Sequence, residues 1–329
     1  MTARTPRPAI NLGTSKCVLR QDFSSRFRSA RQVPRGRKPR LPSQRQLPPH
    51  HLKHSPTAAA ASQPARAPCN NPNALGVART VEIDTTGGPG FGFEHFKELD
   101  FLRDKEVVLT FDDGPWPVNT PSVLKTLENE CTTGIFFPIG KHATYEPELL
   151  KKVYAAGHTI GSHTWSHANL NNKKLREDQR KEEIEKGLSA IKWALGGIPP
   201  APFFRFPALQ HPPEMVTYLG NRNIAIFSCD LDSFDFKASK PQTVIDNVMR
   251  KLDKLGKGII LMHDFQKHTA EALPDLLKRL KDGGYKVVAM RAKAPAQTLP
   301  EYDQQLLKEV KLPTVSSRPV SSVVTDVSQ

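Results

Sequence analysis

The sequence predicts an α/β fold in which a parallel sheet curves into a barrel. From residue 79 onward, short apolar segments alternate with longer amphipathic segments of helical spacing, which is typical of a parallel sheet covered by helices. Seven apolar segments occur after residue 100, and each but the last is followed by a helical one. This number of strand–helix units favours a barrel.

Each predicted strand is a short apolar run that ends at a turn or at polar residues. An edge strand is expected over Thr80–Asp84, where apolar and polar side chains alternate, and Gly87–Gly90 forms the loop after it. The seven barrel strands are expected over Val107–Phe111, Gly134–Ile139, His158–Ser162, Phe203–Phe206, Ile224–Cys229, Gly258–Met262 and Lys286–Met290.

The predicted helices are marked by caps and by apolar spacing. One begins at Asn119, where a capping residue stands shortly before Pro121. A second covers Leu175–Leu195, with apolar residues spaced three and four apart along one face. A third contains the leucines between Leu273 and Leu280, and Gly283-Gly284 ends it.

The net charge of +14 is concentrated near the N-terminus. The first 80 residues carry fifteen of the 47 Lys and Arg residues and one acidic residue, Asp22, so the other 249 residues are balanced at 32 basic and 32 acidic side chains. Residues 1–78 also contain eleven prolines and few aliphatic residues, which predicts a disordered basic arm. We expect a folded domain over 79–295 and a flexible C-terminal tail over 296–329.

The composition of the chain also bears on three further questions, which are nucleic-acid binding, membrane insertion and export. No nucleic acid is expected as a partner, because the aromatic residues of the arm are only Phe23 and Phe27. No run of about 18 apolar residues occurs, so we expect no membrane span. The arm also lacks the apolar stretch of about 7–15 residues typical of a secretory signal, so either this export route is not used or the true start differs.

The four cysteines, Cys17, Cys69, Cys131 and Cys229, form no CxxC pair, so a zinc-ribbon site has no support. A disulfide at Cys131 or Cys229 stays open, but two thiols beside strands are more often small buried apolar residues. The sequence therefore leaves the redox compartment undecided.

Polar residues that could carry chemistry follow several of the predicted strands. Asp112 and Asp113 end the first barrel strand, and His163 and His167 follow the third. Two histidines four residues apart lie on one side of a helical turn, so both imidazoles could reach one metal ion. Taken alone, the two aspartates could form an ordinary surface turn, and the two histidines could belong to an ordinary polar helix face. Together, one carboxylate and two imidazoles predict a catalytic metal site with open positions.

Further candidates end later strands. Arg205 rises from an apolar strand and needs a carboxylate partner, and three acids including Asp235 follow the fifth strand. His263 follows four apolar residues and is not expected at the surface. This set suits metal-assisted hydrolysis, in which a carboxylate takes a proton from water and a histidine protonates the leaving group. We expect structural or peripheral roles for four other histidines, His142, His158, His211 and His268.

Over roughly residues 100–292, the chain resembles the polysaccharide deacetylases of carbohydrate esterase family 4, also called NodB-homology domains. Five motifs carry the resemblance in the order of the family. They are Thr110-Phe111-Asp112-Asp113-Gly114-Pro115, His163-Thr164-Trp165-Ser166-His167, Arg205-Phe206-Pro207, Asp232-Ser233-Phe234-Asp235-Phe236 and Leu261-Met262-His263.

The resemblance implies a distorted (β/α)7 barrel and metal-dependent removal of acetyl groups from a polysaccharide. It implies that the metal ligands are Asp113, His163 and His167. It also implies that Asp112 is the general base held by Arg205, and that His263 is the general acid oriented by Asp235. The metal is expected to be divalent, with Zn²⁺ first and Co²⁺, Mn²⁺ or Ni²⁺ as alternatives.

Two departures from the family pattern concern the substrate. Where the family usually has Tyr-Gly after the third motif, this chain has Ala208-Leu209, and we expect the oxyanion role to stay with the Ala208 backbone, next to Pro207. Phe236 replaces the usual Trp, so it keeps an apolar wall but lacks an indole N–H.

The leading hypothesis is a deacetylase of N-acetylglucosamine polymers, either chitooligosaccharide or peptidoglycan. The alternatives are a hydrolase of a non-carbohydrate amide on the same scaffold, a carbohydrate-binding protein without turnover and a nucleic-acid-binding protein led by its arm. We expect a monomer. The resemblance suggests an extracytoplasmic or cell-envelope location, and the cytoplasm stays open because no signal peptide is found.

Overall fold

The computed structural model describes residue 64 and residues 68–310, and in this part of the chain the predicted alternation of strands and helices is confirmed. All strand pairs within it are parallel. The strands are β1 (Arg79–Ile83), β2 (Gly90–Phe91), β3 (Glu106–Asp112), β4 (Ile135–Phe137), β5 (Thr159–Ile160), β6 (Phe203–Phe204), β7 (Ala225–Phe227), β8 (Leu231–Asp232), β9 (Gly258–His263) and β10 (Lys286–Ala292).

The strands form a distorted barrel of two sheets. The larger sheet has the order β1-β10-β3-β4-β5, with β9 paired to β3 and β8 paired to β9, and the smaller sheet has the order β2-β7-β6. A parallel bridge between Ser162 and Phe204 joins the end of β5 to β6. The barrel is distorted because its strands are distributed over two sheets that this bridge connects.

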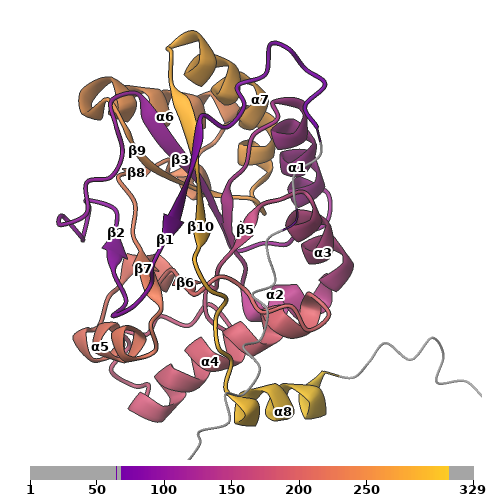
Figure 1. Ribbon diagram of the computed structural model, residues 1–329, viewed down its shortest axis with the longest axis vertical. Helices are drawn as coiled ribbons and strands as arrows, with labels where there is room; N and C mark the ends of the chain where they lie inside the picture. The colour runs from indigo at the N-terminus through magenta and orange to yellow at the C-terminus, as the bar shows by residue number, and fades with distance from the viewer. Residues whose placement is uncertain (1–63, 65–67, 311–329) are drawn as a thin grey trace, which may run out of the picture. The chain divides into compact units, whose positions relative to one another are not determined.

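Strand β3 lies at the centre of the larger sheet (Figure 1). Its first residues pair with β10 and its last residues with β4 along one edge, and β9 pairs along the other edge. The register places Asp112 beside Phe137 of β4 and His263 of β9. Residues 151 positions apart in the sequence thus meet at one end of the sheet.

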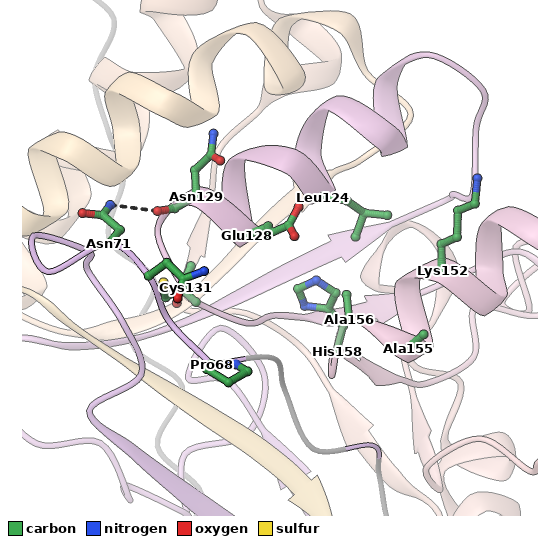
Figure 2. A pocket seen from close by; sticks show the side chains of 12 residues that line it. Pro68, Asn71, Leu124, Glu128, Asn129, Cys131, Lys152, Ala155, Ala156 and His158 are labelled. Atoms are coloured by element: carbon green, nitrogen blue, oxygen red, sulfur yellow. Dashed lines mark hydrogen bonds between the residues drawn. The ribbon is translucent and has the colours of Figure 1, made fainter.

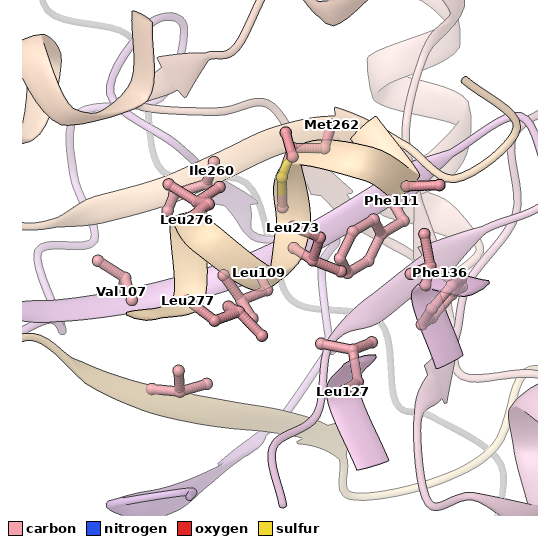
Figure 3. Packing of buried hydrophobic residues seen from close by; sticks show 14 of the residues in the cluster. Val107, Leu109, Phe111, Leu127, Phe136, Ile260, Met262, Leu273, Leu276 and Leu277 are labelled. Carbon is pink, nitrogen blue, oxygen red and sulfur yellow. The ribbon is translucent and has the colours of Figure 1, made fainter. Parts of the chain in front are cut away.

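Both faces of β3 are buried, which explains its almost continuous run of apolar residues. Figure 3 shows Leu109 and Phe111 packed with leucines of helix α7 and with Leu127 of helix α1. The alternate residue Val108 faces a second cluster with Phe137 and Ile259. The helices that cover the first face therefore hold β3 from outside, and the second cluster fills the space on the opposite face.

Helices connect the strands. They are α1 (Asn119–Asn129), α2 (Gly140–Tyr145), α3 (Pro147–Ala155), α4 (Glu177–Ala194), α5 (Pro213–Asn221), α6 (Pro241–Leu255), α7 (Lys267–Asp282) and α8 (Pro300–Glu309). The predicted start at Asn119 is confirmed, and α7 ends just before Gly283, as predicted. No helix in the described ranges is long and apolar enough to cross a membrane.

The segment from Pro68 to Ala78 differs from the predicted arm, because it is attached to the barrel domain. Cys69 forms a disulfide with Cys131, just after α1. The backbone N–H of Gly76 donates to the carbonyl of Glu130 at 2.9 Å, and that of Ala78 donates to Val287 of β10 at 2.8 Å. The predicted boundary after residue 78 therefore falls at the end of this attached segment, and the attachment begins as early as Cys69. The rest of the predicted arm, apart from residue 64, lies outside the described residues.

Helix α8 likewise lies inside the segment predicted to be a flexible tail. It packs on α4 through Leu306, which is buried, and through an ion pair of 2.8 Å between Asp303 and Lys192. Residues 311–329 of the predicted tail lie outside the described residues.

Candidate active site

The end of β3 places two neighbouring carboxylates in different surroundings. Asp112 is the last residue of the strand, and Asp113 has a φ angle of 73°, which turns the chain out of the strand direction. Both residues are buried. The turn lets Asp112 face Arg205 while Asp113 faces the two histidines of the second motif.

Asp113, His163 and His167 form the only group among the described residues whose ligand atoms are close enough to hold a metal ion. Asp113 Oδ1 lies 3.5 Å from His163 Nε2 and 3.4 Å from His167 Nε2. This oxygen is buried and has no hydrogen-bond partner, an arrangement that costs free energy unless a cation fills the gap. The donor set of one carboxylate and two imidazoles fits a divalent transition-metal ion.

The protonation of the two histidines suits the same function. Burial lowers the pKa of His163 and of His167, which favours the neutral imidazoles that bind metals. His163 Nδ1 is 2.7 Å from the carbonyl oxygen of Arg205, so Nδ1–H donates there and Nε2 is left to bind a metal ion. Burial raises the pKa of Asp113, and a bound cation would oppose that effect.

The helical turn predicted for the two histidines is wrong. Residues 163–167 form a loop in which Thr164 and His167 have φ angles of 67° and 61°. The backbone of Trp165 instead donates to the carbonyl of Glu183 in α4 at 2.7 Å. The centroids of the two rings still lie 4.9 Å apart, so the loop, like the predicted helical turn, brings both imidazoles together.

Arg205 is fully buried and holds Asp112. Its Nη1 donates to Asp112 Oδ1 at 2.7 Å and to Thr110 Oγ1 at 2.8 Å. Its Nη2 donates to the carbonyl of Ser228 at 2.9 Å, and the guanidinium lies over the ring of Phe137. These contacts fix the guanidinium so that the Asp112 carboxylate is both paired and oriented.

His263 is held by Asp235, as the resemblance implied. The ring Nδ1 lies 2.6 Å from Asp235 Oδ1, and the backbone N–H of His263 donates to Oδ2 at 2.7 Å. Thr269 Oγ1 also donates to Oδ2, so the carboxylate is fixed from α7 as well. Burial by itself would lower the pKa of His263, but the hydrogen bond and charge of Asp235, with Asp112 and Asp113, raise it to about 9.

A pocket of about 460 Å³ opens over these groups. Ala208 and Phe236 line it, whereas Pro207 is buried and is not among its lining residues. Ala208 and Leu209 have φ angles of 53° and 52°, an uncommon conformation for residues with a side chain. The Phe236 ring meets the His263 ring edge to face, with centroids 5.7 Å apart.

Three residues that the sequence analysis did not assign to the site also belong to its surroundings. His95 lines the pocket, and His142 Nδ1 lies 2.6 Å from the carbonyl oxygen of Asp113.

Asp264 is buried, which raises its pKa to about 7, and it accepts hydrogen bonds from Gly114 N and Thr120 Oγ1. A Cβ at Gly114 would lie 2.1 Å from Asp264 Oδ2, so only glycine fits there. In the sequence, only the position of Asp264 directly after His263 indicated that it lies near the site.

A larger hollow of about 970 Å³ lies elsewhere, between α1 and α3 (Figure 2). Its lining includes Cys131, Lys152 and His158, and Figure 2 also shows Asn71 donating to the backbone of Asn129. None of its lining residues belongs to the metal-ligand group found in the described part of the chain. Volume alone therefore does not identify the site.

Comparison with known proteins gives consistent matches. A family model described as polysaccharide deacetylase matches residues 101–225. A chitooligosaccharide deacetylase of Sinorhizobium fredii is 30% identical over 212 residues, which cover 57% of this chain and 95% of that protein. A peptidoglycan-N-acetylmuramic acid deacetylase of Bacillus subtilis is 29% identical over 199 residues, and the match spans 57% of this chain but only 38% of that relative.

The fold is also similar to a solved structure, a peptidoglycan deacetylase of Bdellovibrio bacteriovorus. The TM-score is 0.60 at 30% sequence identity, and the match covers 71% of this chain and 64% of that chain.

Proposed function

This chain belongs to the polysaccharide deacetylase family, and we propose that it removes acetyl groups from N-acetylglucosamine-containing polysaccharides or oligosaccharides with the help of a divalent metal ion. The reaction breaks the amide C–N bond with water and releases acetate and a free amine. The observation that carries this proposal is the unpartnered, buried Asp113 Oδ1 facing two imidazole nitrogens.

Asp113, His163 and His167 would hold the ion. We propose Zn²⁺ first, because it prefers a mixed set of oxygen and nitrogen ligands with an open position, and Co²⁺, Mn²⁺ and Ni²⁺ are alternatives. A bound ion would polarise the acetyl carbonyl and make a water molecule easier to deprotonate.

Asp112 is proposed as the general base. Its Oδ1 is occupied by the hydrogen bond from Arg205, and its Oδ2 is turned toward the metal-ligand group, 3.9 Å from His163 Nε2. The carboxylate can therefore take a proton from the attacking water with Oδ2 while Oδ1 keeps it oriented.

His263 is proposed as the general acid. With a pKa of about 9, it is protonated at neutral pH, and it lines the same pocket from the neighbouring strand. Its ring can then give a proton to the leaving amine nitrogen. The backbone N–H of Ala208 is proposed to stabilise the oxyanion, with Pro207 keeping the turn rigid and Phe236 forming a wall for the sugar.

The names of the relatives support glycans as substrates. The matched proteins are named for chitooligosaccharide and for peptidoglycan, and both polymers contain N-acetylated sugars. A non-carbohydrate amide is the second candidate. It is favoured by Leu209, which replaces the usual glycine and adds an apolar side chain to the pocket.

The proposal is tested by measuring acetate release from chitooligosaccharides, peptidoglycan and acetylated xylan, with and without a chelator. We expect chelation to abolish release and added Zn²⁺, Co²⁺ or Mn²⁺ to restore it. Asp112→Asn should lower the rate on the order of 10²-fold or more without loss of bound metal.

Two histidine variants test whether loss of metal is specific to the proposed ligands. The double variant His163→Ala/His167→Ala should lose the metal measured by elemental analysis, whereas His268→Ala on α7 should keep it. A double variant that still bound one equivalent and turned over substrate would overturn the ligand assignment. Turnover of small amides without any glycan turnover would favour the second candidate.

A further inference from the structure

One face of helix α4 lies against the loop of residues 163–167, which carries two of the proposed metal ligands. Glu183 and Gly187 are four residues apart in α4, so they lie on the same face of the helix. A Cβ at Gly187 would lie 2.8 Å from the backbone carbonyl carbon of Thr164, which is closer than such atoms approach in folded proteins. Glycine at this position therefore allows α4 to contact the backbone of the loop directly.

The conformation of this loop is strained, so its surroundings have to hold it. Thr164 and His167 have φ angles of 67° and 61°, a region that residues with a side chain rarely adopt. Such residues cost free energy and persist only where neighbouring groups fix them. On one side of the loop, the first two backbone N–H groups of α2 donate to the carbonyls of Thr164 and Trp165, both at 2.9 Å. On the other side, the loop is held by α4.

Glu183 of α4 binds two consecutive residues of the loop. Its backbone carbonyl accepts a hydrogen bond from Trp165 N at 2.7 Å. Its carboxylate accepts from both polar groups of Ser166, from the backbone N–H at 2.8 Å and from Oγ at 2.7 Å. Two hydrogen bonds between one carboxylate and one residue fix the orientation of that residue as well as its distance. Glu183 therefore fixes Ser166, which directly precedes His167.

The two proposed histidine ligands differ in how their rings are held. The His163 ring is buried, and its Nδ1 donates to the carbonyl of Arg205. The His167 side chain is 42% exposed, and its ring makes no such hydrogen bond to a backbone carbonyl within the described part of the chain. The position of the His167 ring therefore depends on its own backbone, which Ser166 connects to Glu183.

We propose that Glu183 is a positioning residue that sets the affinity of the site for its metal ion, by holding Ser166 and with it His167. This inference rests on the proposed function, because it takes His167 as a ligand. Ligands that are fixed in advance bind an ion more tightly, since they need not be ordered when it binds. Glu183 lies outside all five sequence motifs, and only the contact between α4 and the loop assigns it this role.

The experiment measures the Kd for Zn²⁺ by competition between the zinc-loaded full chain and a coloured chelator. Glu183→Ala should raise this Kd about 10- to 100-fold, as removal of a group that orients a metal ligand does. Glu183→Gln should raise it less than about 10-fold, because an amide can accept from the N–H of Ser166 and donate to its Oγ. The matched control is Glu182→Gln, which should leave the Kd unchanged, since the Glu182 carboxylate accepts from Gln305 of α8 instead.

A second measurement separates positioning of the ligand from a general effect on stability. Bound Zn²⁺ stabilises the folded protein by an amount that depends on its Kd. The rise in Tm on adding Zn²⁺ should therefore be smaller in Glu183→Ala than in the parent protein. If the parent bound Zn²⁺ but Glu183→Ala had the same Kd and the same rise in Tm, the positioning role would be overturned and the ligand assignment would stand. A parent that bound no Zn²⁺ would overturn both.

A double-mutant cycle tests whether Glu183 acts through Ser166. Ser166→Ala removes the bond from Oγ but keeps the backbone N–H, so it should raise the Kd less than Glu183→Ala does. The double variant Glu183→Ala/Ser166→Ala should have about the same Kd as Glu183→Ala alone, because both substitutions remove one shared contact. Additive losses in the double variant would overturn the route through Ser166.

Discussion

His163 and His263 each use Nδ1 for a hydrogen bond to the protein, which directs Nε2 toward the pocket. The acceptor is a backbone carbonyl for His163 and the Asp235 carboxylate for His263. The neutral carbonyl adds no charge, and burial lowers the pKa of His163. The carboxylate adds a negative charge, and the pKa of His263 rises instead to about 9. These opposite shifts fit the roles proposed for the two histidines, a neutral metal ligand at His163 and an acid at His263.

The variant Asp235→Asn tests whether the Asp235 carboxylate raises the pKa of His263. A protonated His263 is lost as the pH rises through its pKa of about 9, so the alkaline limb of the rate profile should reflect that group. Without the charge of Asp235, the burial of His263 would dominate and lower its pKa. The alkaline limb of kcat should therefore move to lower pH while metal content stays the same. An unmoved alkaline limb would disprove the pairing of Asp235 with His263.

At the scale of elements, α8 shows how a short helix is attached by few contacts. Leu306 is 1% exposed and lies in the contact with α4, whereas the next residue, Leu307, is 62% exposed. Two ion pairs flank this contact, Lys192–Asp303 and Lys186–Glu309. Each pair keeps a carboxylate in contact with solvent, since Asp303 is 26% and Glu309 44% exposed. Because solvent weakens such pairs, we infer that burial of Leu306 contributes more than they do.

The prediction for α8 uses the two neighbouring leucines. Leu306→Ala should lower the free energy of unfolding by about 2–5 kcal/mol, as for a buried leucine elsewhere. Leu307→Ala should change it by less than about 0.5 kcal/mol. Urea unfolding followed by circular dichroism measures both. Equal effects in the two variants would mean that α8 does not dock in solution as described.

At the scale of the whole molecule, the Cys69–Cys131 disulfide joins the segment before β1 to the end of α1 across 62 residues of sequence. Cys131 N donates to the carbonyl of Glu128 at 2.9 Å, and Glu130 accepts a hydrogen bond from Leu75, so the disulfide lies among other contacts. Cys229 is the remaining cysteine in the described residues and is buried with a free thiol. A disulfide of this kind is typical of proteins that fold in an oxidising compartment.

Reduction should therefore destabilise the protein. A disulfide typically contributes about 2–4 kcal/mol, mainly by limiting the unfolded chain. Urea unfolding with and without a reductant should show that loss in the parent protein. The double variant Cys69→Ser/Cys131→Ser should be less stable than the oxidised parent, and the reductant should not change its stability further. If the reductant changed the double variant as much as the parent, the stabilisation would come from another source.

The sequence by itself determined the alternation of strands and helices and the set of residues at the strand ends. These features are local, because apolar spacing, caps and polar residues after a strand are visible within one stretch of chain. Arg205 could also be expected to pair with a carboxylate, since a guanidinium on an apolar strand needs one. The proposed roles of Asp112 and His263 come from the order of the motifs, through the family resemblance.

Tertiary structure alone decided which distant segments meet. The pairing of β3 with β9 brings Asp112 beside His263, and the buried Asp264 fixes the turn at Gly114. It also decided that a loop, and not a helix, brings His163 and His167 together. Such contacts depend on strand order, register and burial, which no local pattern encodes, because the same short segments could pair in several ways until the whole core is packed.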